Sequence, residues 1–73
     1  MREKRLAIWE EAVGVLNDVD VQDGIILVNL SIGKIAIPLQ KLIFKKLNKM
    51  VGKKIAILRT DVKGKEYLLR EVS

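Results

Sequence analysis

The sequence from Val19 to Pro38 predicts two tight β-hairpins in succession. It reads Val19-Asp-Val-Gln-Asp-Gly-Ile-Ile-Leu-Val-Asn-Leu-Ser-Ile-Gly-Lys-Ile-Ala-Ile-Pro38. Asp23-Gly24 is its strongest turn signal, because a type I′ turn needs positive φ at both central residues. A two-residue loop at this position sets the register of the first hairpin and places Gln22 opposite Ile25.

This register gives the hairpin one apolar face and one face that carries its acidic residues. The apolar face contains Val15, Val19, Val21, Ile26, Val28, Leu30 and Ile32. The opposite face contains Asp18, Asp20, Gln22, Ile25, Leu27 and Asn29. A slip of one residue would bury the aspartates, so the pattern favours a single register.

A second turn is predicted at Ile32-Gly33, with Ser31 opposite Lys34. A bulged turn with Gly33 in the left-handed region is the alternative, because isoleucine tolerates positive φ poorly. Pro38 has no N–H to donate, so the third strand is expected to end there.

Beyond Pro38 the apolar period changes from that of a strand to that of a helix. One face of a helix of about thirteen residues would carry Leu39, Ile43, Leu47, Met50 and Val51. Gly52 is expected to end this helix. Strands are predicted at 53–59 and 66–72, with a turn between them.

Residues 2–11 fit two interpretations. Leu6 and Ile8 alternate with their neighbours as in a strand, whereas Leu6, Trp9 and Val13 fit a helical stripe. We favour a strand that starts at about Leu6 and continues into the first hairpin.

Such a long strand needs a bend or bulge, which we place at Glu10-Glu11 or at Gly14. Trp9 is expected to fill one end of a barrel, because an indole buries a large area. Contact with a partner or stacking on a nucleic-acid base is the alternative for Trp9.

The chain has 73 residues, no cysteine and no histidine, so residues 1–73 are expected to form one domain. A chain this short buries only roughly 60% of its unfolded surface, and homodimerisation is one way to add stability. The chain contains neither a secretory signal pattern nor a membrane-spanning apolar run, which favours a cytoplasmic protein. Its richness in isoleucine, valine and lysine resembles that of thermophile proteins.

The predicted order of elements is β-β-β-α-β-β. Together with Gly14 in a long first strand and Gly52-Lys-Lys-Ile-Ala-Ile-Leu after the helix, it resembles the oligonucleotide/oligosaccharide-binding (OB) fold. The resemblance covers residues 12–72 and implies a mostly β domain, a small five- to six-stranded β-barrel with one helix. An SH3-like barrel with residues 6–9 as an extra strand is the alternative.

The parts required for most enzyme sites are missing. Without histidine or cysteine, neither a Ser-His-Asp nor a Cys-His arrangement nor a zinc site can form. Residues 18–29 lack the glycine and glutamate that a calcium loop needs at its sixth and twelfth positions. We expect no enzymatic activity, no cofactor, no metal and no small-molecule substrate.

The net charge of +5 is unevenly distributed. Residues 1–24 contain three basic and six acidic side chains, whereas residues 25–73 contain eleven basic and three acidic ones. Seven lysines and no acidic residue fall between Lys34 and Lys54. A one-sided basic surface is typical of proteins that bind polyanions, and a merely solubilising surface is the alternative.

Two functional hypotheses follow. The first is weak, sequence-independent binding of RNA or DNA by Lys41, Lys45, Lys46, Lys49, Lys53, Lys54 and Arg59. Against it, single-strand binders stack bases on aromatic rings, and this chain has only three aromatic residues. The second is a homo-oligomeric or other protein-interaction module that uses Ile25, Leu27 and Leu42 as exposed apolar residues.

Overall fold

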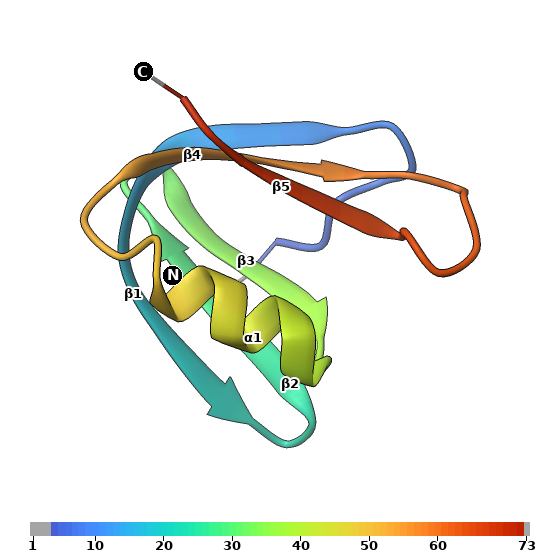
Figure 1. Cartoon of the computed structure of the whole chain (residues 1–73), viewed down its shortest axis with the longest axis horizontal. Helices are drawn as coiled ribbons and strands as arrows, with labels where there is room; N and C mark the ends of the chain where they lie inside the picture. Colours follow the sequence, from blue (N-terminus) through green and yellow to red (C-terminus); the bar gives the residue numbers. More distant parts are fainter. Residues whose placement is uncertain (1–3, 73) are drawn as a thin grey trace.

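The computed structural model describes residues 4–72 and has five strands and one helix over that range (Figure 1). The elements are β1 (Glu11–Gln22), β2 (Ile25–Leu30), β3 (Gly33–Pro38), α1 (Lys41–Asn48), β4 (Lys54–Arg59) and β5 (Tyr67–Glu71). The predicted element order and the mostly β class are confirmed. Over these residues no helix has the length and apolar character needed to cross a membrane.

All five strands belong to one antiparallel sheet in the order β3-β2-β1-β4-β5. The long strand β1 takes part in both halves of this sheet (Figure 1). Its residues 11–15 pair with β4, and its residues from Leu16 onward pair with β2. The β2–β3 hairpin lies on one side of β1 and the β4–β5 hairpin on the other, so this one strand holds the two hairpins together.

The sheet is not closed into the predicted barrel. Within residues 4–72, β5 pairs only with β4, and the outer edge of β3 is bonded by Lys4. Lys4 N–H donates to the Lys34 carbonyl, and Ala36 N–H donates to the Lys4 carbonyl, both at 2.8 Å. These bonds occupy part of the β3 edge that a closing strand would need.

The first hairpin has the predicted register. Gln22 lies opposite Ile25, and the turn residues Asp23 and Gly24 have φ of 51° and 74°. Both angles are positive, as a type I′ turn requires. Pro38 is the last residue of β3, as its missing N–H predicts.

The second hairpin differs from the prediction. Its turn is formed by Ser31 and Ile32, so Leu30 pairs with Gly33 and Val28 pairs with Ile35. Gly33 has φ of 142°, a conformation that suits glycine, and the turn places Ile32 in solvent. The pairing has moved by two residues, an even number, so the same side chains of β3 still face the core.

The first half of β1 buries the opposite face to the one predicted. Ala12 and Leu16 are buried there, whereas Val15 is 38% exposed. The register shifts between Leu16 and Asp18, so the bulge is at Asn17 and not at Glu10-Glu11 or Gly14. One extra residue changes the phase of a strand, which is why Val19 packs against the core after the bulge.

Helix α1 has eight residues and is shorter than predicted. Gln40 before it has extended backbone angles, and Met50 lies in the turn that follows it. Gly52 has φ of 89° and belongs to that turn, so it does not end the helix itself.

One contiguous apolar core lies on the inner face of the sheet. Its members are Leu6, Ala12, Leu16, Ile26, Val28, Leu30, Ile35, Ile37, Leu47, Ile55 and Ile57. Helix α1 contributes the fully buried Leu47, and its partly buried Ile43 and Phe44 pack against the core. Burial of a leucine side chain of this kind stabilises the fold by about 1.5–3 kcal/mol.

Residues 4–10, the N-terminal segment, run from the edge of β3 to the end of β4 and form no strand (Figure 1). The predicted strand from Leu6, and with it the extra strand of the SH3-like alternative, is therefore wrong; residues 2–3 lie outside the described range. Leu6 is only 2% exposed. Trp9 is 58% exposed with φ of 67°, so it does not fill the end of a barrel.

Candidate nucleic-acid interface

Helix α1 presents a group of lysines on its solvent side. This lysine face consists of Lys41, Lys45 and Lys46 in the helix and Lys49 directly after it. All four side chains are exposed. At 3.6 residues per turn they fall within an arc of about 140°, so their charges act on the same region of solvent.

No acidic side chain in the described part of the chain forms an ion pair with the lysine face. The ion pairs of residues 4–72 are Lys4–Glu10, Lys53–Glu71 and Arg70–Glu11. Lys45 and Lys46 lie in the last turn of α1, where the helix dipole favours cations. The lysine face therefore has no direct ion-pair partner within residues 4–72, and the carboxylate that lines the adjoining groove, that of Glu66, accepts from the Gly64 N–H.

Lys53 and Lys54 extend the basic surface beyond the helix. Both are exposed; Lys53 lies directly before β4 and Lys54 is its first residue. The Lys53 Nζ atom lies 3.2 Å from the Glu71 carboxylate, which offsets part of its charge. Lys54 forms no ion pair within residues 4–72 and is the stronger candidate of the two for contact with a phosphate.

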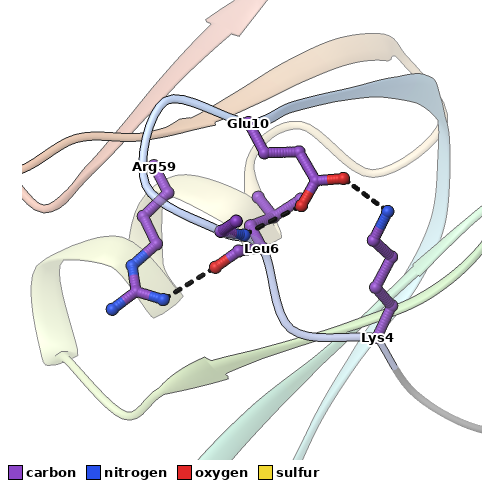
Figure 2. Close-up of polar contacts among 5 residues, drawn as sticks. Lys4, Leu6, Glu10 and Arg59 are labelled. Carbon is purple, nitrogen blue, oxygen red and sulfur yellow. Dashed lines mark hydrogen bonds and ion pairs between the residues drawn. The ribbon is translucent and has the colours of Figure 1, made fainter.

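Arg59 has a structural contact that the sequence did not indicate. It lies at the other end of β4 from Lys54, and its guanidinium donates a 2.7 Å hydrogen bond to the Leu6 carbonyl (Figure 2). The same guanidinium lies 6.0 Å from the centroid of the Tyr67 ring. Its assignment to a nucleic-acid interface stays a prediction.

The three predicted interface residues differ in exposure. Leu42 is 80% exposed and lies among the lysines of α1. Ile25 and Leu27 are half-buried on β2. Leu42 is thus exposed as expected, whereas Ile25 and Leu27 are less exposed than expected. The role of all three in an interface stays a prediction.

A groove of about 220 Å³ lies between α1 and the segment that leads into β5. Leu42, Ile43 and Lys46 line it from the helix. Lys65, Tyr67, Leu68 and Leu69 are among its lining residues on the opposite side. Sequence reasoning missed this groove, although Leu42, which departs from the apolar pattern of the helix, was a partial signal for it.

The loop between β4 and β5 is held by its own hydrogen bonds. Thr60 is 3% exposed, accepts the Val62 N–H at 3.1 Å and donates to the Lys65 carbonyl. The Gly64 N–H donates to the Glu66 carboxylate at 3.0 Å and thereby lowers the pKa of Glu66. These bonds fix the backbone that carries Lys65 beside the groove.

The outer face of β1, β2 and β3 has the opposite charge. A shallow hollow of about 350 Å³ on it is lined by Asp18, Val19, Asp20, Leu27, Asn29 and Lys34. The two carboxylates outnumber the one ammonium group, so this face repels phosphates on balance.

Residues 4–72 contain no group of three or more carboxylates placed to hold a metal ion.

Comparison of the chain with protein-family models, with curated proteins and with solved structures gave no match. Function is therefore inferred from the surface of the chain itself.

Proposed function

We propose that the protein binds RNA or DNA weakly and without sequence preference through the lysine face of α1. The supporting observation is that Lys41, Lys45, Lys46 and Lys49 are exposed together, with no ion-pair partner in residues 4–72. Lysine ammonium groups neutralise phosphates as point charges and carry no information about bases. In this proposal the protein is not an enzyme and needs no cofactor.

The groove beside the lysine face favours a single-stranded ligand. Single-strand binders combine a basic surface that follows the phosphates with aromatic rings that stack on bases. Tyr67 lines the groove together with Lys46 and Lys65, so one base would reach an aromatic ring while its phosphates meet the lysines. The exposed Trp9 is less suited to this role, because its backbone bonds to Arg59 at the far end of β4 from Lys54.

The resemblance to OB domains gives secondary support. In those domains the face of strands 2 and 3 binds oligonucleotides. Here the outer face of β2 borders Asp18 and Asp20 on β1, which disfavours phosphates. We therefore place the ligand on the helix side and not on the sheet face that the resemblance implies.

The test is a fluorescence-anisotropy titration of labelled single-stranded RNA and DNA of about 15 nucleotides. We expect micromolar dissociation constants at low salt that weaken linearly with salt on a log–log plot. Replacing Lys45 and Lys49 by glutamine should lower the slope by about 1.4, since each single-strand phosphate contact contributes about 0.7.

The matched control is Arg5→Gln with Lys34→Gln, which also removes two positive charges, at exposed sites away from the lysine face. It should leave the slope unchanged. Absence of binding at low salt, or equal slopes for the helix variant and the control, would contradict the proposal.

A further inference from the structure

We infer that the chain associates with a second copy of itself, with Leu42 and the lysine face of one copy docked on the acidic outer face of the other copy's β1–β2 hairpin. This inference is independent of nucleic-acid binding, although both ligands would use the same lysines. It depends on a match between two surfaces of opposite charge, each of which has an apolar side chain at its centre.

The first surface is centred on Leu42. At 80% exposure it is the most exposed large apolar side chain described. On the helix it lies between Lys45 and Lys46 in angle, and it lines the same groove as the 45% exposed Leu68. A single exposed leucine is ordinary. An exposed leucine that adjoins an apolar groove with charged residues at its border is typical of an interface.

The second surface is centred on Leu27. This side chain is half-buried in the hollow that Asp18 and Asp20 border, and Leu27 lies directly opposite Asp20 in the register of the hairpin. From Asn17 to Asn29 the chain contains three aspartates and no basic residue. Lys34 at the rim reduces the negative charge of the hollow without cancelling it.

The two surfaces have complementary layouts. One is a projecting leucine surrounded by ammonium groups, and the other is a recessed leucine bordered by carboxylates. Complementary potentials of this kind orient two proteins and raise the rate of their encounter. Apolar contact between Leu42 and Leu27 would add the short-range part of the affinity.

Within one copy the two surfaces do not meet. Leu47 anchors α1 to the inner side of the sheet, whereas Leu27 and Asp20 lie on the outer side of β2 and β1. The two surfaces can therefore contact each other only when they belong to different copies. A contact between two different patches either closes into a ring or, when its rotation does not close, continues as a chain of copies.

The test uses sedimentation velocity of the full chain over a range of concentrations, at low and at high salt. Wild-type protein should increase in average mass with concentration and dissociate as salt screens the charges. Lys45→Glu with Lys46→Glu, and separately Asp18→Lys with Asp20→Lys, should each weaken association by about tenfold or more.

The decisive sample is an equimolar mixture of the two charge-reversed variants. The intact acidic face of one fits the intact basic face of the other, so the mixture should regain association that neither variant shows alone. Leu42→Ser changes no charge at an exposed position and should also weaken association. Arg5→Glu with Lys63→Glu, at exposed sites outside both surfaces, is the matched charge control and should behave as wild type.

A wild-type chain that stays monomeric at every concentration in low salt would overturn the inference. A mixture of variants that stays monomeric while the wild type associates would also overturn it. Nucleic-acid binding is measured separately, because the Asp18→Lys, Asp20→Lys variant should lose self-association but bind RNA and DNA at least as tightly as the wild type, since it gains positive charge. Failure of one proposal can thus be told apart from failure of the other.

Discussion

The guanidinium of Arg59 donates a 2.7 Å hydrogen bond to the carbonyl oxygen of Leu6, although 53 positions separate the two residues (Figure 2). The backbone of Arg59 adds two more contacts, because its carbonyl accepts from Trp9 N–H and its N–H donates to the Glu10 carbonyl. The N-terminal segment is therefore attached to the end of β4 by three hydrogen bonds, and it carries Leu6 into the core.

Arg59→Met should lower the free energy of unfolding by about 1–2 kcal/mol. The loss reflects one partly buried hydrogen bond from a charged donor, while the methionine side chain keeps most of the apolar packing. Urea denaturation measures this change. The control is Arg70→Met, which removes an exposed ion pair with Glu11 and should cost less than about 1 kcal/mol.

Leu6→Ala should destabilise the protein by about 2–4 kcal/mol, because Leu6 is 2% exposed and its truncation leaves a cavity in the core. The same urea titration tests this value. Ile8→Ala, two residues away at a site that is 52% exposed, should change the stability by less than about 0.5 kcal/mol. Equal effects of the two substitutions would show that the N-terminal segment does not pack as described.

Gly14→Ala should destabilise the protein by about 1 kcal/mol, because the new methyl group would lie 2.9 Å from the Ser31 Oγ atom. That hydroxyl accepts the Val15 N–H at 3.0 Å, so a rotation that avoids the methyl group loses this hydrogen bond. In a Ser31→Ala background the bond is already absent, and Gly14→Ala should cost little. A double-mutant cycle measures the coupling, and additive effects would contradict the contact.

Glu10 should make the stability depend on pH in the acid range. The Lys4 ammonium group and then the Ala7 N–H donate to its carboxylate and hold the pKa of Glu10 below its ordinary value of 4.5. Since the folded state disfavours protonation, ionised Glu10 stabilises the fold at neutral pH. This contribution is lost as the pH falls through the lowered pKa.

Glu10→Gln removes this contribution, so stability should fall less between about pH 7 and about pH 3 than it does in the wild type. Lys4→Met removes the main cause of the lowered pKa and should act in the same direction. Urea denaturation at both pH values provides the comparison. A pH dependence in Glu10→Gln as steep as that of the wild type would rule out the proposed linkage.

The candidate interface could be predicted only in part. The three lysines of α1 and Lys49 after it were recognisable because residues three or four positions apart share a face of any helix. The groove beside them was not, because its second side comes from Lys65 to Leu69, about twenty positions later in the chain. The contact of Arg59 with Leu6 likewise joins residues that no local pattern connects.

The sequence by itself determined the local structure. Asp23-Gly24 specified the first turn and its register, Pro38 ended β3, and the change of apolar period located α1. Each of these depends on backbone preferences or periodicity within a few residues. Only the tertiary structure decided the bulge at Asn17, the pairing of Lys4 with β3 and the exposure of Trp9. Each of these features depends on packing and hydrogen bonds between segments that are far apart in the sequence, and no local pattern encodes such contacts.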